Sequence, residues 1–173
     1  MQSERWDILN SNGVSTGRTV VRGGGLASGE YHLVVHIWIV STDGRFLIQQ
    51  RSKGKKLMPG EWAATGGAAV AGEDSFTAAS RELFEELGIE SDEDSLRFLT
   101  RMKRRNSLLD VWLITTDTPS ENLVLQESEV AQAKWVSKEF LCDMIKKGKF
   151  HNYGKEYFST VFSKIDDYKG AVV

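Results

Sequence analysis

The order of apolar and polar residues along the chain predicts a sheet of strands with helices between and after them. Residues 31–40, YHLVVHIWIV, are rich in β-branched and aromatic side chains, which is typical of a central strand. Asp43-Gly44 is a turn signal, after which residues 45–51 are expected to run back as a neighbouring strand. An Asn12-Gly13 turn predicts a hairpin over residues 5–22 in the same way. The remaining strands are expected at residues 62–66, 96–102, 108–116 and 133–136, and closing helices at 138–147 and 153–165.

Residues 75–87 are expected to form an amphipathic helix. Its apolar residues recur at spacings of three and four, and they are Phe76, Ala79, Leu83 and Leu87. Asp74 or Ser75 can cap the start of the helix, and Gly88 fits the left-handed backbone position that ends one. The apolar stripe is expected to pack on the sheet. Strands with helices on both sides favour an α/β fold of three layers.

Three carboxylates, those of Glu82, Glu85 and Glu86, lie together on the same helix, because positions three and four apart share a face. Like charges this close repel, and a divalent cation removes the conflict, since oxygen ligands suit Mg²⁺ or Mn²⁺. Arg81 can bind Glu85, four residues on, or the side chain of Glu73. The residues alone leave a second interpretation open, a solvated acidic helix face with an internal Arg–Glu pair.

Composition narrows the class of protein. The chain has 173 residues, which fits one domain, and 40% of them are hydrophobic. A net charge of −2 argues against a nucleic-acid binder or a protein of anionic membrane surfaces. The sequence holds no apolar run long enough to span a membrane and no apolar leader at its start. Its single cysteine, Cys142, has no partner for an internal disulfide, so we expect a reducing, cytoplasmic location.

The segment around the acidic helix resembles the signature of the Nudix hydrolase superfamily. The matching residues are Gly67, Glu73, Arg81, Glu82, Leu83, Glu85, Glu86, Gly88 and Ile89, with every fixed position present and no gap. The resemblance extends to roughly residues 30–165 through the QQR that ends at Arg51 and a late Trp135-Val136. It implies a Nudix-type α/β/α sandwich with a mixed β-sheet over residues 30–173, after an N-terminal β-hairpin extension over residues 1–29.

The resemblance also implies an activity. Nudix hydrolases cleave a diphosphate linkage by attack of water, usually in a nucleoside diphosphate derivative, so the expected substrate is such a compound or another small organic diphosphate. The carboxylates of Glu82, Glu85 and Glu86 are expected to bind Mg²⁺ or Mn²⁺. Gly67 is expected to allow the backbone to approach the metal or the substrate closely. Arg81 is expected to orient these ligands. No protein partner is implied apart from a possible homodimer.

Substrate contacts and the general base are expected outside the helix. Arg51 and Glu73 are the expected substrate contacts, and the lysines of the following loop, Lys53, Lys55 and Lys56, and the basic run at residues 101–105 are weaker candidates. Among Nudix enzymes the base is a glutamate of the signature or one from a later loop. Glu129 is our candidate for it, and Glu127 and the helix glutamates remain alternatives.

Two other functions compete with hydrolysis. The N-terminal segment resembles the isopentenyl-diphosphate-isomerase-like branch of the superfamily, and His32 matches a metal-binding histidine of those isomerases. The isomerases also need a cysteine and further histidines just after the equivalent of Trp62, where this chain has AATGGAAVAGE with neither residue type. His32 and His36 are therefore interpreted as core or rim residues. A non-catalytic Nudix-fold binding module is the third possibility, although such modules typically carry damaged signatures.

Overall fold

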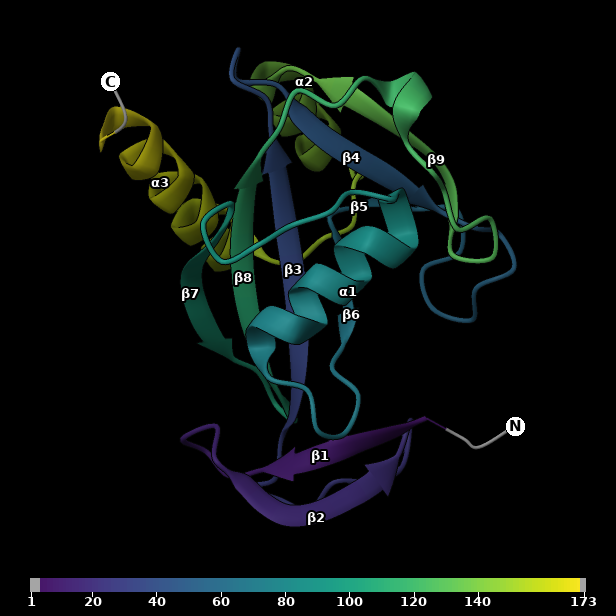
Figure 1. The fold of residues 1–173 in the computed structure, drawn as a ribbon, viewed down its shortest axis with the longest axis vertical. Coiled ribbons are helices and arrows are strands. Elements are labelled where there is room, and N and C mark those ends of the chain that lie inside the picture. The colour runs from purple at the N-terminus through teal and green to yellow at the C-terminus, as the bar shows by residue number, and fades with distance from the viewer. Residues whose placement is uncertain (1–3, 172–173) are drawn as a thin grey trace.

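Strand β3 (His32–Val40) lies at the centre of a seven-stranded mixed sheet, as its apolar sequence predicts (Figure 1). The structure is a computed structural model that describes residues 4–171. One edge of β3 pairs in parallel with β8 along its whole length, and the other edge is shared by two antiparallel strands. Its elements are β1 Arg5–Leu9, β2 Ser15–Val21, β3 His32–Val40, β4 Phe46–Arg51, β5 Trp62–Ala63, β6 Thr65–Ala68, α1 Ser75–Leu87, β7 Leu96–Lys103, β8 Ser107–Thr115, the 3₁₀ turn Ser120–Asn122, β9 Val130–Val136, α2 Lys138–Lys146 and α3 Lys155–Ala171.

One edge of β3 is divided between strands β4 and β6. Strand β4 pairs with Ile39 and Val40 at one end of β3, whereas β6 pairs with residues 34–37 towards its other end. The single strand expected at residues 62–66 is therefore two short strands, because the chain leaves β4 at β5 and joins β3 at β6. Strand β9 also begins earlier than expected, at Val130, because residues 130–132 continue the pairing with β4 although they are partly polar.

Helix α1 covers one face of the sheet, and its predicted stripe and caps are confirmed. Ala79, Leu83 and Leu87 are fully buried in the core beneath it, and Phe76 packs at the edge of that core. The Asp74 carboxylate accepts a hydrogen bond from the Thr77 amide at 2.8 Å, so that residue is the cap. Gly88 ends the helix with φ of 70°, a conformation that costs a residue with a side chain free energy.

Helices α2 and α3 cover the opposite face and complete the expected three layers (Figure 1). Alternate residues of β3 separate the two cores. Leu33, Val35 and Ile37 face α1, whereas Trp38 and Val40 pack with Leu141 of α2 and Val161 and Ile165 of α3. No helix among residues 4–171 is both long and apolar enough to span a membrane.

Strands β1 and β2 form a separate two-stranded sheet below the main sheet (Figure 1). The hairpin is joined to the body by reciprocal backbone hydrogen bonds between Leu9 and Tyr31, at 2.7 and 2.9 Å. Trp6 stacks on His32 at the start of β3, with ring centroids 4.0 Å apart and planes within 8° of parallel. These contacts hold the hairpin against the end of β3, which places it beside a large cavity.

Candidate active site

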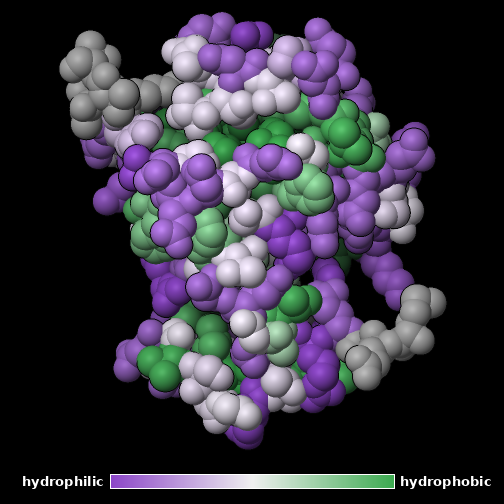
Figure 2. Space-filling view, viewed as in Figure 1, coloured by the Kyte–Doolittle hydropathy of each residue, from purple (hydrophilic) through white to green (hydrophobic). Residues whose placement is uncertain are grey.

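A cavity of about 900 Å³ lies between α1, the first half of β3 and the hairpin. The loop after β4, the segment before β9 and residues 151–153 complete its wall. In the space-filling view the surface is hollowed above the hairpin, on the side where these loops lie (Figure 2). The cavity is large enough for a nucleotide-sized ligand. It contains Gly67 and the helix residues Arg81, Glu82, Glu85 and Glu86, which the sequence predicts as site residues.

Two glycines of β6 let the α1 carboxylates reach this cavity. A side chain at Gly67 would overlap the carboxylate of Glu82, so only glycine leaves that carboxylate its position. Gly66 has φ of 151°, and a side chain there would collide with the backbone of Val35 and His36. Its amide donates a hydrogen bond to Glu86 at 3.1 Å, and Gln49 donates a second one at 2.8 Å. The carboxylates of Glu82 and Glu86 thus pack against strand β6.

The two glycines predict different consequences of a single added methyl group. We expect Gly67→Ala to keep the fold, because the displaced atoms belong to the flexible end of Glu82, and to lower turnover by moving that carboxylate. We expect Gly66→Ala to lower the free energy of unfolding by about 1–3 kcal/mol, because its φ is strained and its neighbours are backbone atoms. Thermal melts and turnover of both variants test this, and equal stability of the two would contradict it.

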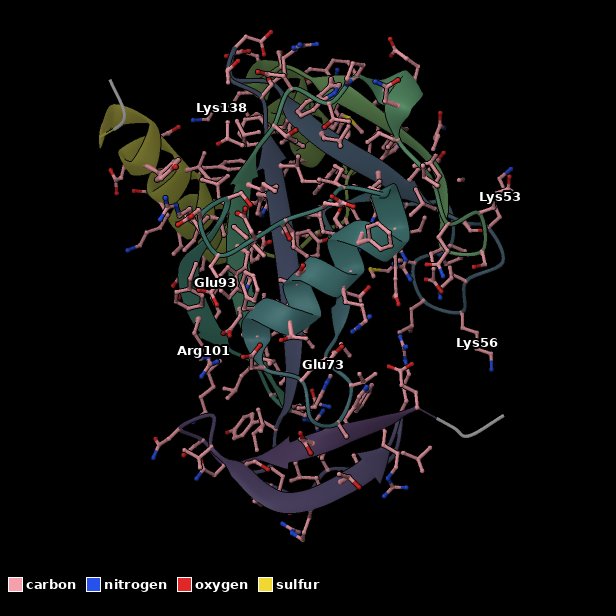
Figure 3. All side chains as sticks on the ribbon, in the orientation of Figure 1. Lys53, Lys56, Glu73, Glu93, Arg101 and Lys138 are labelled. Carbon is pink, nitrogen blue, oxygen red and sulfur yellow. The ribbon has the colours of Figure 1, made fainter. Side chains whose placement is uncertain are left out.

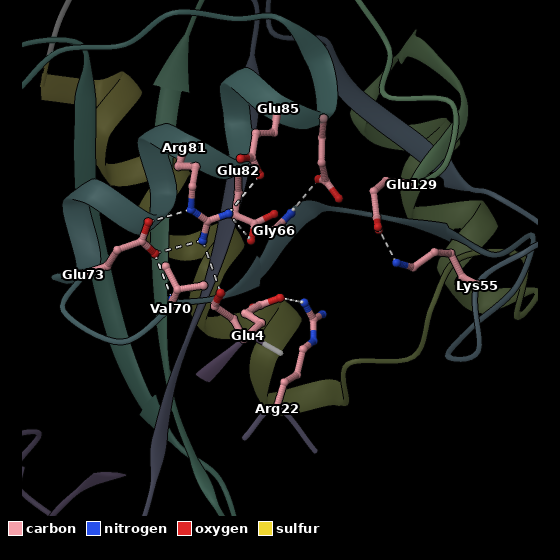
Figure 4. Close-up of polar contacts among 12 residues, drawn as sticks. Glu4, Arg22, Lys55, Gly66, Val70, Glu73, Arg81, Glu82, Glu85 and Glu129 are labelled. Atoms are coloured by element: carbon pink, nitrogen blue, oxygen red, sulfur yellow. Dashed lines mark hydrogen bonds and ion pairs between the residues drawn. The ribbon is translucent and has the colours of Figure 1, made fainter. Parts of the chain in front are cut away.

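Arg81 binds three carboxylates at once (Figure 4). Its Nε and one terminal nitrogen bind both oxygens of Glu73 at 2.6 and 2.9 Å, and the other terminal nitrogen binds Glu82 and Glu85 at 3.0 Å each. Both partners that the sequence allows for Arg81 are therefore used. Glu73 also accepts a hydrogen bond from the Val70 amide at 2.9 Å and does not line the large cavity, so its place is behind Arg81 instead of against a substrate.

The surroundings of Glu82 and Glu86 disfavour the ionised form of both side chains. Burial, followed by the charge of Glu82, raises the pKa of Glu86 to about 8, although hydrogen bonds from Gln49 and Gly66 oppose the shift. Burial also raises the pKa of Glu82 against the attraction of Arg81. Acidic side chains that are buried side by side and accessible from a cavity are a donor set that suits a hard divalent cation, whose binding would displace their protons. The buried Oε1 of Gln49 has no hydrogen-bond partner in the described chain and adds an unused oxygen beside Glu86.

The three helix carboxylates do not converge on one point in this structure. Among residues 4–171, no group of three acidic, histidine or cysteine side chains is close enough to hold a metal ion. The reason is visible in the contacts, since Arg81 draws Glu82 and Glu85 towards itself while Glu86 stays on Gly66. The donor chemistry fits a divalent cation, and Glu85, the most exposed of the three, has the most room to turn towards one.

Besides Arg81, three arginines line the cavity. Arg51 is the candidate that the sequence favours, and Arg104 in the turn after β7 belongs to the basic run at residues 101–105 that was a weaker candidate, whereas Arg22 at the end of β2 was not predicted. Arg22 is paired with Glu4 at 2.7 Å. In the described part of the chain, neither Arg51 nor Arg104 has a carboxylate within ion-pair distance, so both guanidinium groups are available to an anionic ligand.

The other basic candidates lie elsewhere. Lys53 and Lys56 project into solvent away from the cavity (Figure 3). Arg101 binds Asp110 through two hydrogen bonds of 2.6 and 2.7 Å. Lys55 instead forms an ion pair of 2.5 Å with Glu129, which lines the cavity, whereas Glu127 does not (Figure 4).

His36 and His32 line the cavity from β3, and both are mostly buried. His36 Nδ1 lies 2.8 Å from the hydroxyl of Tyr157, which accepts a hydrogen bond from Trp38 Nε1 at 2.9 Å. Burial, with smaller effects of the Arg104 and His151 charges, lowers the pKa of His36 to about 3. His36 is therefore a hydrogen-bonded residue of both the core and the cavity wall, which agrees with its interpretation as a core or rim residue.

The buried His36 predicts a loss of stability in acid. In the unfolded chain histidine gains a proton near pH 6.5, whereas folded His36 stays neutral until about pH 3. The unfolded state therefore binds more protons in this window, and stability falls as the pH falls, by up to about 1.4 kcal/mol per unit for this group. Urea unfolding of the wild type and His36→Gln at pH 7, 6 and 5 measures the effect. The stability advantage of the wild type should shrink at each step, and a constant difference would contradict this account.

Comparisons with known proteins agree with this site and fold. A family model described as the NUDIX domain matches residues 30–158. An uncharacterized Nudix hydrolase of Listeria monocytogenes is 42% identical over 151 residues, which cover 87% of this chain and 89% of that protein. Nudix hydrolase 3 of Arabidopsis thaliana is 36% identical over 80% of this chain, a match that spans 20% of the plant protein. The fold and the relatives define a hydrolase built on an α/β/α sandwich with an acidic helix. The chain belongs to the Nudix family, and like its relatives it is a Nudix hydrolase.

Two further matches bear on the fold and the branch. A crystal structure of a Deinococcus radiodurans protein superposes with a TM-score of 0.71 and 25% identity, covering 85% of this chain and 91% of that one. The isopentenyl-diphosphate Δ-isomerase of Streptomyces coelicolor is 37% identical over 84 residues, which are 48% of this chain and 43% of the isomerase. The isomerase likeness is thus confined to about half of each chain.

Proposed function

We propose that this protein hydrolyses the diphosphate linkage of a nucleoside diphosphate derivative or another small organic diphosphate, with Mg²⁺ or Mn²⁺ as its cofactor. The observation that carries the proposal is the cavity itself, which is lined both by buried carboxylates of α1 and by guanidinium groups without carboxylate partners. Such a site offers opposite ends to a metal-bound diphosphate, because carboxylates hold cations and guanidinium groups hold phosphate oxygens.

Each residue of the site has a defined task in this reaction. Glu82, Glu85 and Glu86 are the proposed ligands of the cation, which when bound neutralises phosphate charge and lowers the pKa of a coordinated water. Arg81 positions two of these carboxylates, and Glu73 holds Arg81 from behind. Arg51 extends from the end of β4 into the cavity and binds a phosphate oxygen of the substrate. Gly67 leaves room for the Glu82 carboxylate, and Gly66 lets β6 lie close to the backbone of β3.

Glu129 is the proposed general base, because it is the loop glutamate that lines the cavity. Its carboxylate is held by Lys55, which fixes the position of the side chain in the cavity wall. We expect Glu129→Gln to lower kcat about 10²- to 10⁴-fold with little change in KM. Glu127→Gln is the matched control, since Glu127 is two residues away and outside the cavity. Equal kcat in both variants would move the role of base to a helix glutamate.

An isomerase reaction lacks support from the cavity lining. No cysteine is among the residues that line it, and Cys142 lies on α2 on the other side of the sheet. His32 does line the cavity, but its ring stacks on Trp6 and its Nδ1 is sealed from solvent without a partner. The residues available in this site are therefore those of metal-assisted hydrolysis.

A screen for release of phosphate or of phosphomonoester products tests the substrate class. The panel contains nucleoside diphosphates, dinucleoside polyphosphates, nucleotide sugars, coenzyme A, thiamine diphosphate and isoprenoid diphosphates, each with Mg²⁺ or Mn²⁺. We expect at least one diphosphate to be hydrolysed and monophosphates to be left intact. Tight binding of one compound without turnover would instead identify a binding module, and conversion of isopentenyl diphosphate to dimethylallyl diphosphate would identify an isomerase.

A further inference from the structure

A chain of hydrogen bonds fixes which nitrogen of His36 carries a proton. Trp38 Nε1 is a donor only, so the Tyr157 hydroxyl accepts from it at 2.9 Å. Within the described chain the only other partner of that hydroxyl is His36 Nδ1 at 2.8 Å, so the hydroxyl proton is donated to Nδ1. Nδ1 is then an acceptor, and the neutral ring carries its proton on Nε2.

The Nε2–H group of His36 faces the cavity. It has no hydrogen-bond partner among the described residues, and it is also not among the buried polar atoms that are sealed without one, in contrast to Nδ1 of His32. His36 is only 8% exposed and lines the cavity, so the exposed part of its ring is directed into the cavity. The cavity floor therefore presents a hydrogen-bond donor whose orientation is set by Tyr157 and Trp38.

Arg104 supplies a second donor beside it. Arg104 lines the same cavity and is near enough to His36 and Tyr153 for its charge to act on both rings. The Tyr153 ring also lines the cavity and contacts the His36 ring, with ring centroids 4.6 Å apart. His36 and Arg104 offer only donors, and together with a positive charge they suit a group with several acceptor oxygens.

We propose that His36 Nε2–H and the Arg104 guanidinium form a phosphate subsite. It binds one phosphoryl group of the substrate, while the other lies next to the helix carboxylates, where a cation would hold it. The subsite rests on the proposed diphosphate substrate and deepens it, because it assigns a separate place to each phosphoryl group. It also explains how the site would select a diphosphate over a monophosphate, since a monophosphate can use only one of the two places.

Binding of inorganic phosphate to the metal-free, full-length protein tests the subsite without any turnover. Long-range ¹H–¹⁵N spectra of the histidine rings should show His36 protonated at Nε2, with the signal assigned by its loss in His36→Gln. Added phosphate should shift that signal and the Arg104 side-chain signal with one saturating curve. Arg104→Gln should weaken the binding about 10- to 100-fold. Arg105→Gln is the matched control, because Arg105 is exposed and outside the cavity.

Kinetics with the diphosphate identified by the screen give a second measurement. Arg104→Gln should raise KM about tenfold or more and change kcat little, whereas Arg105→Gln should leave both unchanged. Phosphate that shifts Arg51 alone, or equal behaviour of the two arginine variants, would overturn the subsite even if the enzyme hydrolyses diphosphates. Phosphate binding at His36 and Arg104 in a protein that hydrolyses none of the panel would support the subsite and refute the proposed hydrolysis.

Discussion

Glu86→Gln is expected to lower kcat/KM about 10³-fold or more and to make the metal-free protein at least as stable as the wild type. The loss of activity follows because a glutamine oxygen is a weak substitute for a carboxylate at a Mg²⁺ site. The gain or lack of loss in stability follows because Glu86 is 2% exposed, and burial and the charge of Glu82 raise its pKa to about 8, so ionising it near neutral pH costs free energy that a neutral amide avoids. A glutamine oxygen can still accept the hydrogen bonds from Gln49 and Gly66.

Thermal melts with and without Mg²⁺, together with turnover, measure both effects. The wild type should gain stability from Mg²⁺, whereas Glu86→Gln should gain little. Glu90→Gln is the matched control, because Glu90 is exposed just beyond the end of α1 and does not line the large cavity. A less stable Glu86→Gln variant with full activity would show that the carboxylate is a structural residue only.

Arg81→Gln is expected to have the largest effect on stability, a loss of about 3 kcal/mol or more in the free energy of unfolding. The change leaves Glu73 and Glu82 partly buried without their cation, and their side chains are only 13% and 14% exposed. It also removes the guanidinium group that binds both Glu82 and Glu85, so these two carboxylates repel each other in the metal-free protein. Activity should fall in the same variant because two proposed metal ligands lose their positions.

The double variant Arg81→Gln/Glu73→Gln separates the two effects in chemical denaturation and turnover. Removing the Glu73 charge together with the Arg81 charge should recover part of the stability but none of the activity. Arg81→Lys keeps a positive charge but cannot bind Glu73 in the bidentate geometry, so it should fall between the wild type and Arg81→Gln. Additive losses in the double variant would contradict the pairing on which this account depends.

The helix and its charges were predictable because their signals are local. The cap at Asp74, the stripe through Leu83 and the end at Gly88 depend on residues within about four positions of one another, and the structure confirms them. The contact of Arg81 with Glu85 follows from the same helical spacing, since the two residues are four apart.

The opposite wall of the cavity had no such signal. His36 meets Tyr157 across 121 positions of the sequence, and the contact depends on how α3 packs under β3. Arg22 reaches the cavity because the hairpin folds against β3 through the stacking of Trp6 on His32. Arg104 stood in a basic run in which Arg101 was an equal candidate, and only the pairing of Arg101 with Asp110 separates them. Periodicity shows which face of an element is buried, but it does not show which distant element covers that face.

The measurement that tests the central claim most directly is hydrolysis of the diphosphate panel in ¹⁸O-labelled water with Mg²⁺. The claim is that water attacks a diphosphate held between the α1 carboxylates and the arginines of the cavity. It predicts a product phosphate that carries one ¹⁸O atom from the solvent, formed by the wild type and by Glu90→Gln but at least about 10³-fold more slowly by Glu86→Gln. Products without solvent oxygen, or equal rates of labelling by the wild type and Glu86→Gln, would contradict it.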